Sequence, residues 1–336
     1  MKYEYCVYIG RFSPWHNAHF AIAQQAFNIA KQVIIVIGSS NGPRTIKNPW
    51  NDQERKEMIQ STLTPDQLDR VTFVHARDNL YNNNAWLTSV QDKINQVTDY
   101  NQNVALIGFE SDDTSWYLQS FPQFTFIPFK TEYQFHATDI RNLYFSHDDS
   151  YKTMVPQGVV SYLESFKKNN FFTNLKEEKT YIDNYKESWR GAPFPPIFQT
   201  VDAVVVKSGH VLVVNRRCNP GKGLYALPGG FLNPREYLLD GALRELKEET
   251  SIKVSLTNLR NAVANQHTFD APDRSLRGRT ITTAFLVDLG TGELPGIKGG
   301  DDASRAVWLP LNEFYEMENE FFDDHYYIVK YFVSRF

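Results

Sequence analysis

The sequence predicts an α/β protein of two domains: an amino-terminal domain with a parallel sheet and helices on both faces, then an α+β domain with a mixed sheet. The chain has 336 residues, about twice the length of an average domain. Its first half alternates apolar strand patterns with helical patterns, which is typical of a parallel sheet covered on both faces. In its second half, strand patterns surround one acidic helix.

The first half contains five strand patterns and five helix patterns. Strands are expected at 3–9, 33–37, 71–75, 104–107 and 124–127, and helices at 20–31, 51–63, 85–97, 138–144 and 157–166. Asn51 is expected to cap its helix, because an N-cap asparagine with Glu54 three residues later can form a capping box.

The composition changes after the last of these helices. Residues 167–189 are polar, and 190–196 contain three prolines, too many for a helix to continue. We therefore predict a first domain at 1–180, a linker at 181–198 and a second domain at 199–336. Strands of the second domain are expected at 199–206, 211–215, 254–265, 280–288 and 306–309, around a helix at 237–250.

Composition and charge exclude several classes of function. Hydrophobic residues make up 42% of the chain and the net charge is −4, which argues against nucleic acid as a partner but allows nucleotide substrates held by local arginines. Cys6 and Cys218 are the only cysteines, so we expect no disulfide framework and a reducing, cytoplasmic location. No apolar run reaches the ~20 residues of a membrane span, so no membrane partner is expected. Formation of a homo-oligomer stays open.

Charged residues at fixed spacing lie between Gly230 and Ile252. Glu245, Glu248 and Glu249 stand at i, i+3 and i+4, which places three carboxylates on one face of a helix. Hard oxygen ligands gathered in this way suit Mg²⁺ or Mn²⁺. The alternative is an ordinary charged surface helix.

This spacing resembles the signature of the Nudix hydrolases, with Ser251 where that family has glycine. We expect this departure to affect helix capping rather than chemistry. The resemblance implies a Nudix fold and metal-assisted attack of water on a diphosphate, with a general base outside the motif. The implied catalytic residues are Glu236, Arg244, Glu245, Glu248 and Glu249, and the implied metal ligands are Glu245, Glu248, Glu249 and the carbonyl of Gly229.

A second motif, Y-I-G-R-F-S-P-W-H-N-A-H, occupies residues 8–19. Gly10 allows a tight turn after the first strand, and His16 and His19 fall where the next helix should begin. Two imidazoles at a helix N-terminus create an anion site, which can stabilise the charge on a transferring phosphoryl group. The alternative is two surface histidines in a loop.

The residues around both histidines resemble the first motif of a nucleotidyltransferase superfamily. The segments at 37–40, 48–50, 54–55 and 137–141 resemble, in the same order, archaeal-type nicotinamide mononucleotide (NMN) adenylyltransferases. This implies a Rossmann-like fold and adenylyl transfer from ATP to NMN. The implied catalytic residues are His16, His19 and Arg141, and the implied substrate-binding residues are Gly10, Arg11, Phe12, Asn84, Trp86 and Thr138. Trp86 as a core residue, the asparagines as helix caps and an acceptor other than NMN are the alternatives.

Three arginines follow the acidic motif: Arg274, Arg277 and Arg279. Closely spaced guanidinium groups can hold a diphosphate or a ribose phosphate; the alternative is a solvated basic loop. The pattern around them resembles the ADP-ribose-handling branch of the Nudix family, which includes pyrophosphatases and regulators that bind without cleaving. Since the carboxylates of the motif are intact, we favour hydrolysis over an ADP-ribose sensor. The whole chain thus resembles a bifunctional NMN adenylyltransferase and Nudix hydrolase.

Overall fold

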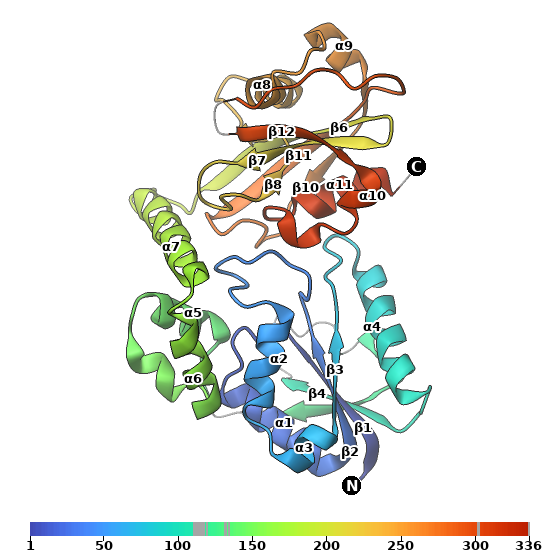
Figure 1. Ribbon diagram of the computed structural model, residues 1–336, viewed down its shortest axis with the longest axis vertical. Coiled ribbons are helices and arrows are strands. Elements are labelled where there is room, and N and C mark those ends of the chain that lie inside the picture. The colour runs from blue at the N-terminus through green and yellow to red at the C-terminus, as the bar shows by residue number, and fades with distance from the viewer. Residues whose placement is uncertain (110–117, 119, 131–132, 134, 301–302, 335–336) are drawn as a thin grey trace. The chain divides into compact units, whose positions relative to one another are not determined.

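The computed structural model describes residues 1–109, 118, 120–130, 133, 135–300 and 303–334. The chain divides into two compact units, Met1–Lys176 and Glu177–Phe336 (Figure 1). Within the described part, none of the helices combines the length and hydropathy that a membrane span requires.

The first unit is built on a parallel sheet with strand order β3-β2-β1-β4-β5. The strands are β1 (Tyr3–Gly10), β2 (Ala30–Ile37), β3 (Val71–His75), β4 (Val104–Phe109) and β5 (Thr125–Phe129). The strand order reverses between β1 and β4. In sheets of this kind, ligands bind beyond the carboxyl ends of the strands at such a reversal, which here is the end of β1 at Gly10.

Helices cover both faces of this sheet, which confirms the predicted fold class. Alternate residues of β1 pack on opposite faces of the sheet. Cys6 and Tyr8 belong to one apolar cluster, whereas Val7 and Ile9 belong to another. The helices are α1 (Asn17–Ile29), α2 (Asp52–Gln60), α3 (Pro65–Asp69), α4 (Asn83–Thr98), α5 (Ala137–Phe145) and α6 (Gln157–Phe166), with a 3-10 turn at Asp149–Thr153. The predicted capping box of α2 is confirmed.

Helix α7 (Asn170–Ser188) differs from the prediction. The segment was expected to be polar linker from residue 181, but it is helical as far as Ser188, and the two compact units divide inside it. Phe172, Leu175, Glu178 and Ile182 are its buried residues. They recur every three or four positions, and this spacing places them on one helical face.

The second unit has a mixed sheet with the path β10-β11-β6-β7-β12, in which β11 and β6 are parallel and the other pairs antiparallel. The strands are β6 (Ile197–Lys207), β7 (His210–Arg216), β8 (Tyr225–Ala226), β9 (Gly229–Phe231), β10 (Val263–Phe269), β11 (Arg279–Asp288) and β12 (Ala303–Pro310). This arrangement confirms the predicted α+β domain.

Helices pack on both faces of the mixed sheet (Figure 1). Leu243 and Leu246 of α8 (Leu238–Thr250) share a core with Ala203 of β6. The remaining helices are α9 (Leu256–Asn261), α10 (Leu311–Phe314) and α11 (His325–Val333), with a 3-10 turn at Glu318–Glu320. The strand expected at 254–265 is wrong in its first half, because Ser255 caps α9 by accepting the Asn258 N–H.

Candidate active sites

The histidine motif forms the entry to α1, directly after β1. His16 is the N-cap residue, and its Nδ1 accepts the backbone N–H of His19 at 3.4 Å. The two imidazole rings stack with their centroids 3.5 Å apart. The structure therefore brings both histidines to one helix N-terminus, where backbone N–H groups and the helix dipole favour an anion.

Burial keeps both imidazoles neutral near neutral pH. His16 is 4% exposed, and burial, with the nearby His136 as a second cause, lowers the pKa of His16 to about 3. Burial and the neighbouring His16 lower the pKa of His19 well below its ordinary value. A neutral imidazole offers one N–H donor and one acceptor, so the two histidines can offer an anion hydrogen bonds but no positive charge.

Phe12, predicted to bind substrate, has its side chain packed behind the histidines. Its backbone adopts a left-handed φ of 52°, and its side chain is 1% exposed. The ring meets Tyr8, Trp15 and His19 edge-on, with centroids 5.0, 5.2 and 5.1 Å away. A Cβ on Gly10 would lie 2.6 Å from this ring. Gly10 therefore makes room for Phe12, and Phe12 fixes the imidazole of His19.

Arg141, a predicted catalytic residue, contacts the segment that contains the histidine motif. Its Nη1 donates to the Ser13 carbonyl at 2.6 Å and its Nη2 to Thr138 Oγ1 at 3.0 Å. Burial, with the nearby charge of Arg11 as a second cause, lowers the pKa of Arg141 to about 10. Arg11 itself is exposed. Two guanidinium groups thus lie near the mouth of the site and can contact phosphates.

Arg55 was missed as a site residue. It is 1% exposed and donates to the carbonyls of Arg11 at 2.5 Å, Gly38 at 2.7 Å and Ser39 at 2.9 Å. These carbonyls follow the carboxyl ends of β1 and β2. Arg55 therefore fixes the backbone that follows β1 and β2, beside the histidine motif. In the sequence, Arg55 appeared only in the 54–55 segment of the resemblance to NMN adenylyltransferases, and no role was assigned to it.

The predicted nicotinamide contacts lie at the start of α4. Asn82, rather than Asn84, caps the helix by accepting the Ala85 N–H at 3.0 Å, which leaves the Asn84 side chain exposed. Trp86 is partly buried, and its ring centroid lies 6.4 Å from that of Phe121. Trp86 is therefore part of the core packing and retains some exposed surface.

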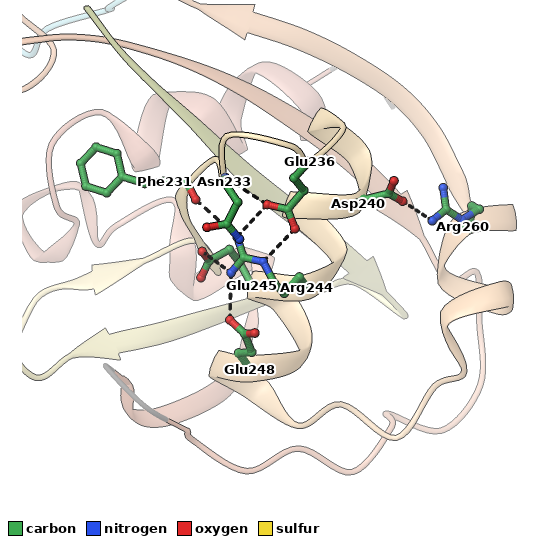
Figure 2. A network of polar contacts seen from close by, with 8 residues as sticks. All are labelled: Phe231, Asn233, Glu236, Asp240, Arg244, Glu245, Glu248 and Arg260. Carbon is green, nitrogen blue, oxygen red and sulfur yellow. Dashed lines mark hydrogen bonds and ion pairs between the residues drawn. The ribbon is translucent and has the colours of Figure 1, made fainter. Parts of the chain in front are cut away.

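In the second unit, Arg244 organises the acidic motif on α8 (Figure 2). Its Nε and Nη2 donate to both oxygens of Glu236 at 2.8 and 3.0 Å. Its Nη1 donates to Glu245 at 2.7 Å and to Glu248 at 2.9 Å. Hydrogen bonds to these carboxylates, that to Glu236 foremost, hold the pKa of Arg244 well above its ordinary value. Arg244 thus orients the acidic cluster from its edge.

The third carboxylate of the motif faces β9. Glu249 Oε2 accepts the Gly229 N–H at 3.1 Å. A Cβ on Gly229 would lie 2.4 Å from both Asp202 Oδ1 and the Val201 carbonyl, and a Cβ on Gly230 would lie 2.6 Å from the Glu245 carboxylate. Only glycine allows the backbone to approach the acidic residues this closely.

The charge balance of this site suits a cation. Burial, followed by repulsion from Glu245 and Asp202, raises the pKa of Glu249 to about 8, and burial also raises the pKa of Glu245. In the described ranges, no group of three Asp, Glu, His or Cys side chains is placed to hold a metal ion, and the Arg244 guanidinium contacts both Glu245 and Glu248. The partly buried carboxylates of Glu245 and Glu249 nevertheless fit a hard divalent cation, which would relieve the repulsion between them.

Ser251 occupies the C-cap of α8 with a left-handed φ of 46°. Its N–H donates to the Lys247 carbonyl at 2.9 Å. This is the backbone geometry that favours glycine. The departure from the Nudix signature thus falls on helix capping, as expected.

The three predicted arginines have different surroundings. Arg274 differs from the prediction: it is buried in a bidentate ion pair with Asp324, at 2.7 and 2.8 Å, because a buried guanidinium needs a carboxylate partner. The guanidinium of Arg277 lies over the ring of Phe231, 5.2 Å from its centroid. Arg279 is partly exposed and donates to the Asp270 carbonyl. Arg277 and Arg279 remain the candidates for contacting a substrate.

Comparison with known proteins agrees with these two sites. Residues 7–143 match the cytidylyltransferase-like family, and residues 196–332 match the NUDIX domain family. The nicotinamide/nicotinic acid mononucleotide adenylyltransferase of Acinetobacter baylyi is 32% identical over 178 residues, which cover 53% of this chain and 94% of that protein. The ADP-ribose pyrophosphatase of Methanocaldococcus jannaschii is 38% identical over 112 residues, which cover 33% of this chain and 61% of that protein.

The likeness to one solved structure extends over both units. The bifunctional NMN adenylyltransferase/ADP-ribose pyrophosphatase from Francisella tularensis, complexed with AMP and a manganese ion, is 34% identical, with a TM-score of 0.94 and 99% of each chain covered. The same protein in a second crystal structure gives a TM-score of 0.92 at 33% identity. With a histidine site in its first unit and a Nudix motif in its second, the chain belongs to the family of bifunctional NMN adenylyltransferase/ADP-ribose pyrophosphatases.

Proposed function

We propose that the first unit transfers the adenylyl group of ATP to NMN, giving NAD and pyrophosphate, and that the second unit hydrolyses ADP-ribose to AMP and ribose 5-phosphate. The main support is the likeness to the Francisella tularensis bifunctional enzyme over 99% of both chains. Further support comes from the paired histidines and from the acidic motif, whose side chains suit the two reactions.

Adenylyl transfer requires positioning and charge stabilisation. A phosphate oxygen of NMN attacks the α-phosphorus of ATP, the bond to the bridging oxygen of the β-phosphate breaks, and pyrophosphate leaves. N–H donors of His16 and His19 stabilise the charge that develops on the transferring phosphoryl group. Arg11 and Arg141 hold the neighbouring phosphates, and Thr138 orients the guanidinium of Arg141.

Asn84 and Trp86 are the proposed contacts of the acceptor nucleotide. The exposed amide of Asn84 can hydrogen-bond the carboxamide of NMN, and the accessible part of the Trp86 ring can stack on the pyridine ring. A neutral amide partner favours NMN over nicotinic acid mononucleotide, whose carboxylate calls for a cation.

In the second unit, Glu245, Glu248, Glu249 and the Gly229 carbonyl are the proposed ligands of Mg²⁺ or Mn²⁺. The cation, when bound, neutralises the diphosphate and lowers the pKa of a bound water. Arg244 and Glu236 keep the carboxylates aligned. Water attacks one phosphorus, the bridging P–O bond breaks, and AMP and ribose 5-phosphate leave. Arg277 and Arg279 hold the substrate.

Both reactions use soluble nucleotides. The free cysteines Cys6 and Cys218 are compatible with a reducing compartment, and we propose that the enzyme is cytoplasmic.

The decisive experiment uses the full-length chain in two assays. With ATP, Mg²⁺ and NMN, we expect NAD and pyrophosphate in equal amounts, and slower product formation with nicotinic acid mononucleotide. With ADP-ribose and Mn²⁺, we expect AMP, and none after EDTA treatment. Absence of NAD would contradict the first proposal. Tight ADP-ribose binding without release of AMP would identify the second unit as a sensor instead.

A further inference from the structure

A turn near the carboxyl terminus contacts the strand that leads into the acidic motif. We call residues Phe322 to His325 the 322–325 turn. The Phe322 N–H donates to the Tyr225 carbonyl at 2.8 Å. The Leu227 N–H donates to the His325 imidazole, at Nδ1, over 2.9 Å. Both contacts are made to the segment immediately before Gly229.

The 322–325 turn is held rigidly from its other side. Asp323 has a left-handed φ of 46°, a conformation that costs a non-glycine residue free energy and persists only where its surroundings fix it. Its neighbour Asp324 forms the bidentate ion pair with Arg274, and the two side chains are 1% and 4% exposed. The arginine predicted to bind substrate therefore anchors this turn.

His325 and Glu249 accept hydrogen bonds from opposite ends of one short backbone segment, residues 227–229. Leu227 is 1% exposed, and its N–H bonds to His325. Two residues later, the Gly229 N–H bonds to Glu249. Between them, the Pro228 carbonyl accepts the Ala203 N–H of β6 at 2.9 Å. Without the imidazole, the buried Leu227 N–H would lose the partner that sets the position of this segment.

We propose that His325 is a positioning residue of the hydrolytic site. Its Nδ1 holds the backbone of residues 227–229 against α8, so that the Gly229 carbonyl and the Glu249 carboxylate converge on one cation, and Arg274 supports this arrangement through Asp324. The proposal rests on the hydrolysis proposed above and adds to it a support outside the acidic motif. It also assigns Arg274 a structural role instead of a contact with substrate.

Two substitutions of His325 test the proposal in the full-length protein. His325→Leu removes the acceptor, whereas His325→Asn keeps an acceptor, Oδ1, close to the position of Nδ1. We expect His325→Leu to weaken Mn²⁺ binding to the nucleotide-free protein, measured by electron paramagnetic resonance, by about 10- to 100-fold. The kcat for ADP-ribose should fall by a similar factor with little change in KM, and His325→Asn should restore most of both. Unchanged Mn²⁺ affinity in His325→Leu would overturn the proposal.

Arg274→Met separates the two roles of that arginine. If Arg274 supports the turn, this variant should lower kcat and Mn²⁺ affinity in the same direction as His325→Leu. If Arg274 is a substrate ligand, KM for ADP-ribose should rise while Mn²⁺ affinity stays at the wild-type value. The second pattern would refute the role assigned to the pair with Asp324.

A separate measurement distinguishes loss of folding from loss of function. Amide hydrogen exchange in β6 and β11 reports whether the second unit of each variant is folded. If His325→Leu unfolds the second unit, His325→Gln takes its place, because the acceptor of glutamine lies one bond further from the backbone than Nδ1 of histidine. Wild-type-like Mn²⁺ binding by His325→Asn but not by His325→Gln would support the proposal. Equal Mn²⁺ binding by the two variants would contradict it. Wild-type protein that binds Mn²⁺ but releases no AMP would contradict the hydrolase activity alone, and Mn²⁺ binding would still decide the role of His325.

Discussion

The histidine site of the first unit and the carboxylate site of the second use burial in opposite ways. In the first, burial lowers the pKa values of His16 and His19, so a phosphate meets neutral N–H donors. In the second, burial raises the pKa values of Glu245 and Glu249, although Arg244 pairs with Glu245. In both, burial disfavours the charged form of the side chain, whereas a bound ligand of opposite charge favours it. The first site is thereby suited to an anion and the second to a cation.

The largest expected effect comes from neutralising the carboxylate site. Glu249→Gln removes a proposed metal ligand but can still accept the Gly229 N–H. We expect AMP release from ADP-ribose to fall by about 1,000-fold, which corresponds to about 4 kcal/mol of transition-state stabilisation. NAD synthesis by the same preparation should be unchanged. The exposed Glu293→Gln is the matched control, and loss of both activities in Glu249→Gln would show that the two sites are not independent.

A substitution of Arg55 tests how far the histidine site depends on the buried hydrogen bonds that hold its backbone. Arg55→Met leaves the carbonyls of Arg11, Gly38 and Ser39 without their donor, and we expect a loss of about 3 kcal/mol in the free energy of unfolding of the first unit. NAD synthesis should decline as well, because the backbone of Arg11 would shift. Urea unfolding and initial rates measure the two effects.

Arg70 provides a matched control for this substitution. It donates to the carbonyls of Phe27, Ala30 and Lys31, at the opposite end of β2 from Arg55. Arg70→Met should therefore lower stability and leave the rate of the folded protein near the wild-type value. Equal rates in the two variants would mean that Arg55 has no particular influence on the site.

His16→Ala removes one of the two imidazoles. Loss of one donor to the developing charge should lower kcat for NAD synthesis by about 100-fold, while AMP release from ADP-ribose stays unchanged. The exposed His147→Ala serves as a control. If ATP affinity fell and kcat did not, His16 would act in the binding of the ground state rather than in the transfer step.

The sequence could predict those features of the fold and the sites that depend on residues close together in the chain. The parallel sheet, the acidic helix and the paired histidines follow from patterns within about 20 residues, and the structure has them. The ion pair of Arg274 could not be predicted from the sequence, because its partner, Asp324, is 50 residues away in the chain. Nothing near Arg274 distinguishes an arginine that will be buried from one that will meet a diphosphate.

The other differences also depend on which side chains the fold buries. Arg55 stands in a helix whose neighbours are charged, and only the fold reveals that its acceptors are carbonyls at the ends of two strands. Helix α7 was missed because its polar composition hid the spacing of Phe172, Leu175 and Ile182. Phe12 belongs to a motif associated with substrate, yet its contacts are with the aromatic rings behind the histidines.

The last prediction is an opposite dependence of stability on pH in the two units. For His16, the folded pKa of about 3 lies below the ordinary value of 6.5, so below pH 6.5 the unfolded chain binds a proton that the folded chain does not. Stability of the first unit should therefore be full above pH 6.5 and fall by about 1.4 kcal/mol per pH unit for one such group as the pH decreases toward 3.

For Glu249, the folded pKa of about 8 lies above the ordinary value of 4.5. The folded, metal-free second unit then holds a proton that the unfolded chain has released, so its stability should decline as pH rises from 4.5 to 8. Hydrogen exchange measured separately for peptides of each unit, between pH 5 and 8 in EDTA, should show the two trends. Mn²⁺ should abolish the decline in the second unit, because a cation favours the ionised carboxylate, and Glu249→Gln should weaken it. A decline that persists unchanged with Mn²⁺ would mean that Glu249 is not a ligand of the cation, and the proposed contrast between an anion site and a cation site would be wrong.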